Sequence, residues 1–455
     1  MLFGSLKVAT CAIDATNRFW HSVMSRKFIF AYLSLFSPLI MSFLKKSTLA
    51  AIILGFSLTA KSTFAQNKKA VLVHTIDSIL NIQVNSDKIP GAVIEVKQGD
   101  DVLLKQAYGY AQKYDYEHRL LAKPDAMTVG TMFDIASLTK MVGTTTSIML
   151  LVDRGQVHIN DPVSKYVQAF GSPDKASITI RNLLTHTAGL YEWYPMYYRA
   201  SNKQETFKLI DELPLAFPIG AGRHYSDLGF TVLGEIIENI SGLPLDQFEE
   251  QNIFIPLGMS HTMFNPLTKH KPSEIAATGP GNPYEHRMVY DPSMGFQFKE
   301  IKHDQWNGWR HSVLRGEVDD GNAWYAEKGV AGAAGLFSTV EDLQKLVDML
   351  MNHGKIGSKQ FISEQTIQAF LTKDKFKNGL GWMMDPENPV IRNGPEGSFG
   401  HTGFTGTSIA VIPSQNISVI LLINREQMGM IDDKAYYNVS PIRAEIFKAV
   451  MRYSE

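Results

Sequence analysis

Strand-like runs near both ends of this chain restrict its fold more than any other feature. Residues 91–97 and 102–110 are rich in apolar residues and flank the turn Gln-Gly-Asp-Asp, which predicts a β-hairpin. Similar runs occupy residues 407–412 and 417–423, on either side of a short turn that begins at Pro413. Because one sheet has to accept both pairs, we expect an α/β unit whose sheet is completed by the C-terminal segment.

Helical patterns lie outside and between these runs. Apolar residues recur with helical spacing at residues 67–86 and again at residues 438–452. The middle of the chain reads as short helices and loops, and no repeat or low-complexity linker divides it. We expect an α/β part formed by residues 66–136 and 336–455, with a mainly helical part, residues 137–335, inserted between them.

The first 65 residues read as a targeting region. Lys45 and Lys46 precede a short apolar stretch, and Thr63-Phe64-Ala65 places small residues where a signal peptidase reads the chain. This pattern predicts a signal peptide over residues 41–65. The apolar stretch is shorter than a membrane-spanning helix requires.

Two alternatives concern the same region. The signal-like pattern begins at Met41, which favours residues 1–40 as an upstream mis-start of the reading frame. The apolar segment at 28–44 instead favours a membrane anchor. The signal peptide predicts an exported, periplasmic domain over residues 66–455, and the anchor predicts the same domain held at the inner membrane. Peripheral association with the membrane stays open under either interpretation.

Charge and cysteine content exclude several classes of function. The 455 residues include 44 Lys and Arg and 45 Asp and Glu, for a formal charge of −1, and no basic stripe suits nucleic acid. Residues 1–65 hold seven of the basic residues and one acidic residue, so the remaining chain is near −7. The one cysteine, Cys11, excludes an internal disulfide framework. No cluster has metal-ligand spacing, so we expect no metal and no cofactor.

Ser137-Leu-Thr-Lys140 is the first candidate for chemistry. Residues three apart share one face of a helix, so the serine hydroxyl and the lysine amine come within hydrogen-bonding reach. A serine at a helix N-terminus also lies where free backbone N–H groups stabilise an oxyanion. A lysine in a dry site is partly neutral and accepts the serine proton. Alone, the tetrapeptide fits a capping serine and a surface lysine equally well.

Tyr225-Ser226-Asp227 is the second candidate, before a helical pattern at residues 228–240. The Tyr225 phenol is placed to share a proton with Lys140 and the serine and to protonate a leaving group. By itself it also reads as a packed aromatic residue.

His401-Thr402-Gly403 is the third candidate, at the start of a strand. An edge strand of small residues offers backbone groups to an extended substrate, and Gly403 permits close approach. Thr402 and a neighbouring cation would hold a substrate carboxylate. Alone, this stretch also reads as a strand-opening turn.

Together, in this order, the three motifs resemble the signature of the serine β-lactamase and penicillin-binding protein superfamily. The resemblance is to its class C-related branch, and most of all to D-alanyl-D-alanine carboxypeptidase-type members. It covers about residues 70–450. The matching stretches are Phe133–Lys140, Leu183–Leu190, Tyr225–Gly234, Pro256–Met259, Gly335–Thr339 and Gly400–Thr407. The resemblance implies a β-lactamase/transpeptidase-like fold, with an antiparallel sheet flanked by N- and C-terminal helices and an inserted helical subdomain.

The resemblance also implies roles for individual residues. Ser137 corresponds to the nucleophile, Lys140 to its activator and Tyr225 to the proton shuttle. Substrate contacts fall on Asp227, His401, Thr402, Gly403 and Phe404, with the oxyanion hole formed by the N–H groups of Ser137 and Phe404.

The chain departs from the usual pattern at several of these positions. Asp227 replaces an asparagine, accepts hydrogen bonds only, and tends to raise the pKa of Lys140. His401 replaces a lysine, so a fixed charge becomes one that titrates near neutrality. Asp319 and Ala333 stand where relatives often carry histidines. These changes put efficient β-lactam turnover in doubt.

Two more residues carry alternative interpretations. We expect His186 to hydrogen-bond backbone groups near the site rather than to take part in catalysis. Arg425, at the end of a strand, fits either a contact to a substrate carboxylate or a surface salt bridge.

Three functions remain open from the sequence. The first is a D-alanyl-D-alanine carboxypeptidase-like serine hydrolase that acts through an acyl-enzyme on Ser137. The second is an esterase or weak β-lactamase, favoured by Asp227 and His401. The third is a non-hydrolytic sensor that binds penicillins or muropeptides. All three imply a small-molecule or peptide ligand, namely a muropeptide, a β-lactam or an ester.

Overall fold

The structure is a computed structural model that describes the backbone of residues 46–454 and the side chains of residues 66–454. Residues 1–40, interpreted above as a mis-start, lie outside the described residues, and so do residues 41–45 of the predicted signal peptide. The backbone of residues 46–65 is helical and begins helix α4, Lys46–Asn85. None of the described helices is both long and apolar enough to span a membrane. The chain divides into two compact units, of which the second is Val71–Glu455.

The second unit contains one large sheet and two small ones. The large sheet has the strand order β3-β2-β1-β11-β10-β9, and every neighbouring pair is antiparallel. Its strands are β1 (Gly91–Gln98), β2 (Asp101–Tyr114), β3 (Leu120–Ala126), β9 (Phe399–Thr402), β10 (Ser408–Ile412) and β11 (Ile417–Ile423). The small sheets consist of β4 (Phe133–Asp134), β5 (Met263–Phe264) and β6 (Leu336–Ser338), and of β7 (Lys355–Ile356) and β8 (Lys359–Gln360).

The predicted hairpin and the predicted C-terminal strands meet at the centre of the large sheet. Strand β1 pairs with β2 on one side and with β11 on the other, so Ala92 lies opposite both Tyr108 and Ile423. The C-terminal segment therefore completes the sheet, and the predicted antiparallel α/β fold is confirmed.

Alternate residues of β1 face two different cores. Ala92 and Ile94 pack in a cluster with Leu72 of α4 and Ile446 of α14 (Ser440–Ser454), whereas Val93 packs with the helical part. This alternation follows from the two-residue period of a strand. The expected terminal helices, residues 67–86 and 438–452, thus share one face of the sheet.

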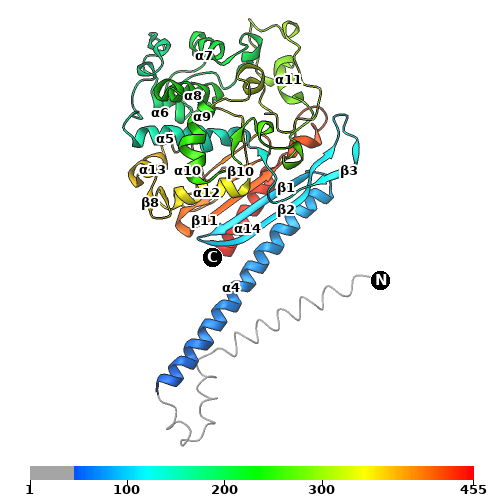
Figure 1. The fold of residues 1–455 in the computed structure, drawn as a ribbon, viewed down its shortest axis with the longest axis vertical. Helices are drawn as coiled ribbons and strands as arrows, with labels where there is room; N and C mark the ends of the chain where they lie inside the picture. Colours follow the sequence, from blue (N-terminus) through cyan, green and yellow to red (C-terminus); the bar gives the residue numbers. More distant parts are fainter. Residues whose placement is uncertain (1–45, 455) are drawn as a thin grey trace, which may run out of the picture. The chain divides into compact units, whose positions relative to one another are not determined.

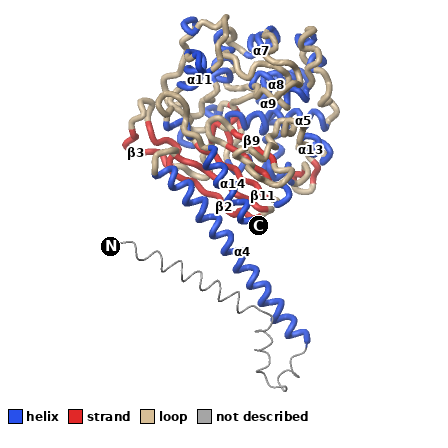
Figure 2. The backbone as a smooth tube through the Cα atoms, turned by 180° about the vertical axis from the view of Figure 1, so that it is seen from behind, coloured by secondary structure: helices blue, strands red, loops and turns tan. Residues whose placement is uncertain are grey.

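The other face carries the remaining helices, which Figures 1 and 2 show gathered on the opposite side of the sheet from α14. They are α5 (Thr146–Asp153), α6 (Ile180–Leu184), α7 (Lys203–Glu212), α8 (Asp227–Ser241), α9 (Leu245–Glu249), α10 (Ile255–Leu257), α11 (Pro283–Tyr290), α12 (Val340–Met351) and α13 (Glu364–Phe370).

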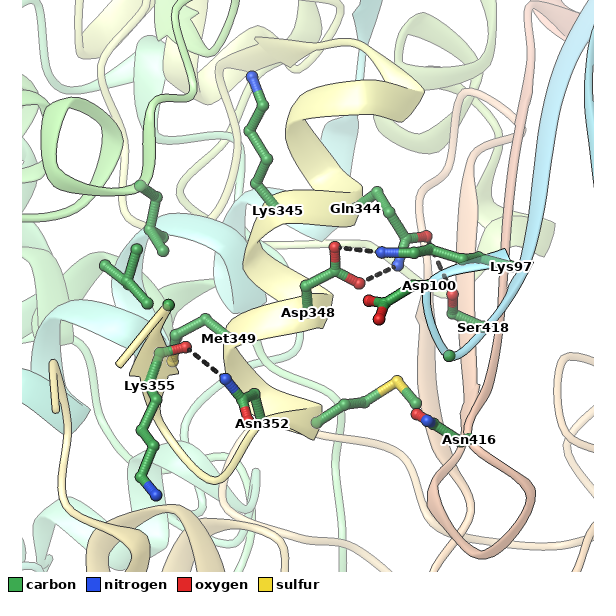
Figure 3. A pocket seen from close by; sticks show the side chains of 15 residues that line it. Lys97, Asp100, Gln344, Lys345, Asp348, Met349, Asn352, Lys355, Asn416 and Ser418 are labelled. Atoms are coloured by element: carbon green, nitrogen blue, oxygen red, sulfur yellow. Dashed lines mark hydrogen bonds and ion pairs between the residues drawn. The ribbon is translucent and has the colours of Figure 1, made fainter. Parts of the chain in front are cut away.

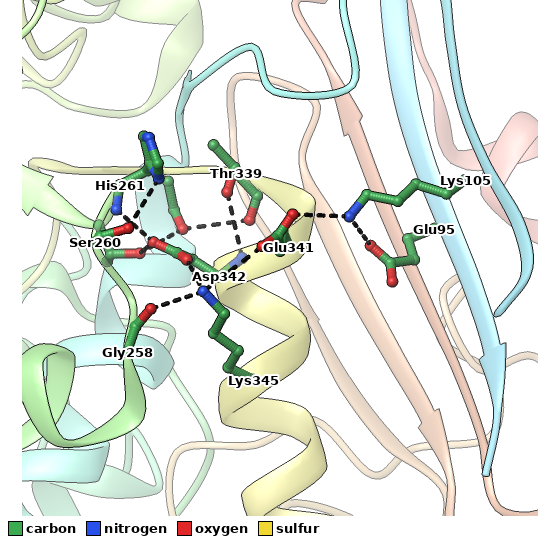
Figure 4. Close-up of polar contacts among 11 residues, drawn as sticks. Glu95, Lys105, Gly258, Ser260, His261, Thr339, Glu341, Asp342 and Lys345 are labelled. Carbon is green, nitrogen blue, oxygen red and sulfur yellow. Dashed lines mark hydrogen bonds and ion pairs between the residues drawn. The ribbon is translucent and has the colours of Figure 1, made fainter. Parts of the chain in front are cut away.

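Helix α12 is tied to the sheet by polar contacts at both ends. Near its C-terminal end, Asp348 pairs with Lys97 of β1 at 2.6 Å, beside a polar cavity of about 550 Å³ (Figure 3). Near its N-terminal end, Lys105 of β2 bridges Glu341 and Glu95 at 3.1 and 3.4 Å (Figure 4). These cross-links fix the helix against the sheet.

The first turn of α12 also fixes a loop of the helical part. The carboxylate of Asp342 accepts the backbone N–H of His261 at 2.6 Å and pairs with Lys345 at 2.8 Å (Figure 4). Its side chain is 1% exposed, so these partners compensate the cost of burying its charge.

The buried carboxyl group of Glu249 lies against the helical segment that follows Ser137. Glu249 is fully buried, and a Cβ on Gly143 would lie 2.2 Å from its Oε2. Neither carboxyl oxygen has a hydrogen-bonding partner among the described residues. Burial, followed by the charge of Asp246, raises the pKa of Glu249 well above its usual range. Near neutrality, the folded protein therefore keeps the Glu249 carboxyl group protonated, whereas the unfolded chain has already released this proton.

Changing Glu249 to glutamine is expected to make the protein progressively more stable than wild type as the pH rises. The pKa of Glu249 is higher in the folded protein than in the unfolded chain. The contribution of Glu249 to stability is therefore complete below the unfolded-state pKa and is lost as the pH rises towards the folded-state pKa. Glutamine needs no proton, so the free energy of unfolding of E249Q relative to wild type grows between about pH 5 and pH 8, by up to about 1.4 kcal/mol per pH unit. The Tm of E249Q minus that of wild type grows with it.

Thermal unfolding followed by circular dichroism at both pH values measures this difference. The control is Glu212→Gln on α7, where the carboxylate is 57% exposed. A Tm difference for E249Q that stays constant with pH would contradict the assignment of a proton to buried Glu249.

Candidate active site

A strained turn presents Ser137. The preceding residue, Ala136, has φ 45°, a left-handed conformation that costs a non-glycine residue about 1–3 kcal/mol. Asp134, at the end of β4, compensates: its Oδ1 accepts the Ala136 N–H at 2.8 Å and its Oδ2 accepts the Asp319 N–H at 2.7 Å. Burial raises the pKa of Asp134 to about 7, although the hydrogen bond from the Asp319 N–H opposes this shift. Asp134 was not predicted as a site residue, although a short acceptor two residues before a turn is a recognisable signal.

The segment that carries Ser137 and Lys140 is helical, but not uniformly α-helical. Ala136–Leu138 is a 3-10 turn and Lys140–Thr145 has π-helical geometry, before α5 begins. The Lys140 Nζ donates to the Ser137 Oγ at 3.0 Å, as the three-residue spacing predicted. Single π-turns inside helices are frequent at functional sites.

Lys140 is buried away from water, but its surroundings favour the charged form of its amine. Its side chain is 1% exposed, pairs with the Asp227 Oδ1 at 2.8 Å, and donates to the carbonyl of Ala333 at 2.8 Å. Burial acts to lower the pKa of Lys140, but the charge of Asp227 and the neighbouring Tyr225 outweigh it, so the pKa is raised. The prediction of a partly neutral lysine is therefore wrong for the free protein, whereas the predicted effect of Asp227 is confirmed.

Tyr225 faces this pair from the loop before α8. Its ring lies 5.2 Å from the Lys140 Nζ and 4.4 Å from the ring of His186. Burial raises the pKa of Tyr225, so the phenol keeps its proton near neutrality. The next residue, Ser226, caps α8 by accepting the Gly229 N–H at 3.2 Å, which fixes where Asp227 begins the helix.

His186 serves as a backbone support. Its φ is 58°, and its Nδ1 accepts the backbone N–H of Ser226 at 3.0 Å. Burial, followed by the charge of Arg223, lowers the pKa of His186 well below its usual range, as an acceptor nitrogen requires. The expectation that His186 hydrogen-bonds backbone near the site is confirmed.

His401 does not titrate near neutrality. Its ring is fully buried, with Nδ1 hydrogen-bonded to the Thr402 carbonyl at 2.9 Å. Burial, followed by the charge of Lys140, lowers the pKa of His401 to about 3. The prediction of a charge that switches near pH 6.5 is wrong, because this imidazole is neutral under physiological conditions.

Gly403 lies against the turn that presents the nucleophile. A Cβ at this position would lie 2.5 Å from the Ile135 carbonyl and 2.1 Å from the Thr407 Oγ1, so only glycine fits. Thr402 is half-buried at the end of edge strand β9, and Phe404 is 40% exposed. No described residue accepts a hydrogen bond from the amide N–H of Ser137 or Phe404. Both amides are thus available to an oxyanion.

Two arginines lie near the site. Arg425 donates from Nε to the Phe404 carbonyl at 2.9 Å and from a terminal nitrogen to the Tyr437 carbonyl at 3.2 Å. It therefore supports the Phe404 loop, which neither of the two interpretations of Arg425 anticipated. Arg223, which was not predicted, lies 5.5 Å from the Tyr225 ring, and its buried Nε has no partner among the described residues.

A cavity of about 300 Å³ opens beside Ser137. Its lining includes Tyr225, Asp227 and Phe404 of the predicted set but not His401, Thr402 or Gly403. The other lining residues are Ala136, Glu192, Trp193, Asn282, Tyr284, Glu285, Met288, Phe296, Asp319, Asp320, Ala334 and Tyr436. Within residues 66–454, no group of three or more His, Cys, Asp or Glu side chains is arranged to hold a metal ion.

Comparison with known proteins agrees with this geometry. The profile of the family described as "Beta-lactamase" matches residues 74–442. A protein of Salmonella paratyphi B named "Putative D-alanyl-D-alanine carboxypeptidase" is 32% identical over 390 residues, which cover 81% of this chain and 86% of that protein. The Salmonella enteritidis PT4 protein of the same name is 32% identical over 87% of this chain and 95% of its own length. The chain belongs to the β-lactamase family, whose members share a serine hydrolase fold.

Solved structures agree on the fold. EstCE1, described as a hydrolase with promiscuous acyltransferase activity, has a TM-score of 0.61 at 20% identity and covers 84% of this chain and 99% of its own. A penicillin-binding protein homologue from Caulobacter crescentus has a TM-score of 0.60 at 19% identity, with coverages of 85% and 97%. An octameric homologue from Pyrococcus abyssi has a TM-score of 0.57 at 24% identity, with coverages of 77% and 73%.

Proposed function

We propose that this protein is an exported serine hydrolase that forms an acyl-enzyme on Ser137. The observation that carries the proposal is the 3.0 Å contact between the Lys140 Nζ and the Ser137 Oγ, next to two unoccupied backbone amides. The Ser137 Oγ attacks a carbonyl carbon, and the oxyanion that forms accepts the N–H groups of Ser137 and Phe404.

The proton balance assigns a part to Asp227. Lys140 is charged in the free protein, so it accepts the Ser137 proton as it passes one of its own to the Asp227 Oδ1, 2.8 Å away. The phenol of Tyr225 then donates its proton to the leaving group. In the second half of the reaction, water gives a proton to the Tyr225 phenolate and attacks the acyl carbon. As the product acid leaves, the proton held by Asp227 returns through Lys140 to the Ser137 Oγ, which restores the free enzyme.

The leading substrate class is a D-alanyl-D-alanine-type peptide. This choice rests on the name of the Salmonella relatives and on the edge strand β9, whose free edge offers backbone groups to an extended peptide. An ester is the second candidate, and the neutrality of His401 favours it, because no fixed charge stands where relatives carry a lysine.

A turnover panel on the chain from Gln66 separates these candidates. The substrates are a diacetylated D-Ala-D-Ala tripeptide, nitrocefin and a p-nitrophenyl ester, each with Ser137→Ala as the blank. We expect the peptide to be hydrolysed with the highest kcat/KM. An ester preference would replace the carboxypeptidase proposal by an esterase, and a stable penicillin adduct with no turnover of any substrate would indicate the non-hydrolytic sensor.

Changing Asp227 to asparagine is expected to alter the pH dependence of catalysis. The amide cannot accept the relayed proton, so kcat/KM near pH 7 falls by about tenfold or more. Removing the carboxylate also lowers the pKa of Lys140, so the activity of D227N recovers as the pH rises towards about 9. The measurement is kcat/KM against pH for both proteins, with thermal unfolding to verify folding. Parallel pH profiles would contradict the relay through Asp227.

A further inference from the structure

The cavity beside Ser137 has an unusual charge balance. Five carboxylates line it, and no lysine, arginine or histidine is found among its lining residues within the part of the chain that the structure describes. Lys140 compensates Asp227 from behind the lining, and Arg310 reaches the Asp319 backbone at 3.0 Å. No lysine or arginine among the described residues forms an ion pair with Glu192, Glu285 or Asp320, although the charge of Lys140 acts to lower the pKa of Asp320. Glu192 is the least enclosed, with a side chain 47% exposed and His224 at 3.9 Å.

Glu285 and Asp320 are held in place by the backbone of one loop. The Glu285 Oε2 accepts the Gly321 N–H at 2.8 Å, and the Asp320 Oδ1 accepts the Ala323 N–H at 2.8 Å. A Cβ on Gly321 would lie 2.4 Å from the Glu285 Oε1, so the loop approaches this carboxylate as closely as glycine allows. The two acids are therefore positioned parts of the cavity wall.

The second oxygen of Glu285 lacks a well-aligned donor. Its Oε1 is buried, and the nearby Tyr197 hydroxyl acts as a hydrogen-bond donor that opposes the rise in the Glu285 pKa without satisfying this oxygen fully. A buried acceptor that is incompletely paired is destabilising, and a donor on a bound ligand would relieve that cost. Burial and the charges of Asp320 and Asp319 raise the pKa of Glu285 well above its usual range, and a bound cation would oppose that shift.

Aromatic rings form another part of the same wall. Tyr284 lies 5.2 Å from Phe404 and 6.0 Å from Tyr436, and Phe404 lies 5.9 Å from Tyr436. All three line the cavity. Arg425, outside the lining, already packs its guanidinium 5.1 Å from the Phe404 ring. Aromatic faces next to carboxylates favour ammonium groups, and quaternary ammonium ions in particular.

We infer that this cavity binds a positively charged ammonium group on the acyl portion of the substrate, between the carboxylates Glu285 and Asp320 and the aromatic wall. The inference rests on the proposed acyl-enzyme function and names the substrate class within it. An anionic acyl group would instead raise the pKa values of Glu285 and Asp320 further. A leaving-group carboxylate belongs instead beside Thr402, outside this lining.

Two esters of equal shape test the inference. The p-nitrophenyl ester of 4-(trimethylammonio)butanoic acid carries the cation, and the ester of 5,5-dimethylhexanoic acid replaces the nitrogen by carbon. The readout is the ratio of their kcat/KM values after subtraction of the Ser137→Ala rate. We expect a ratio of about ten or more in the wild type, which is the upper part of the cation–π range.

The variants Glu285→Gln and Asp320→Asn are each expected to lower this ratio, and the double variant to bring it close to one. The matched control is Glu212→Gln, an exposed carboxylate on α7, which is expected to keep the wild-type ratio. A wild-type ratio of one or less, or a ratio unchanged in a folded double variant, would overturn the inference.

Failure of the proposed function gives a different result. If neither ester is turned over faster than by Ser137→Ala, the acyl-enzyme proposal fails, and binding then tests the cavity alone. Calorimetric titration of Ser137→Ala with 4-(trimethylammonio)butanamide and with 5,5-dimethylhexanamide provides that test. Tighter binding of the cationic amide supports the inference, and equal or weaker binding refutes it.

Discussion

Replacing Ser137 with alanine is expected to lower kcat/KM for every hydrolysed substrate by at least about 10⁴-fold, as loss of the nucleophile does in other serine hydrolases. Ser137 supplies the only atom that bonds to the acyl group, so no neighbouring side chain replaces it. Ser137 is half-buried, and its Oγ accepts a hydrogen bond from Lys140. When the Oγ is removed, the Lys140 ammonium keeps its two other partners, Asp227 and the Ala333 carbonyl.

Steady-state kinetics of wild type and S137A, with the substrate that the panel selects, measure this loss. Because two of the three partners of Lys140 remain, we expect the Tm of S137A to stay within a few degrees of the wild-type value. A folded S137A protein that retains more than about a hundredth of wild-type kcat/KM would contradict the assignment of Ser137 as nucleophile.

Replacing Lys140 with methionine is expected to lower kcat by about 10²–10⁴-fold, the usual contribution of a positioned acid–base group. Methionine keeps the apolar length of the side chain but removes the link between Ser137 and Asp227. The half-buried Asp227 then loses its ion pair at 2.8 Å, so a stability loss accompanies the loss of rate.

The double variant K140M/D227N separates the two effects. Removing both charges leaves no unpaired carboxylate, so we expect the Tm to recover while kcat stays low. Recovery of both quantities together would mean that Lys140 serves only to neutralise Asp227.

The central strands of the large sheet were predictable because their signals are local, whereas β3 was not predicted. The turn between residues 97 and 102 and the apolar runs at 407–412 and 417–423 each specify a strand, and β1 pairs with β11 where the sequence required the two ends to meet. The three motifs around Ser137, Tyr225 and His401 were equally readable, because each depends on neighbours in the sequence.

The electrostatics of the site were not predictable in the same way. The neutral state of His401 depends on complete burial and on Lys140, which is 261 positions away in the sequence and close in space. The charge state of Lys140 depends on a competition between burial and Asp227, whose outcome the sequence does not give.

The acids of the cavity wall were missed for a related reason. Glu285 and Asp320 occur in unremarkable local sequence, and only the folded chain places them beside one nucleophile. Asp319 was noted for the histidine that it replaces, whereas its backbone N–H, bonded to Asp134, supports the turn that presents Ser137.

The most direct test of the central claim is to trap the acyl-enzyme analogue and locate it. The protein that begins at Gln66 is treated with a fluorophosphonate probe, and intact-mass and peptide spectra are recorded beside those of S137A. We predict one adduct per wild-type chain, on the peptide that contains Ser137, and none on S137A. An adduct on another residue, or equal labelling of S137A, would contradict the account.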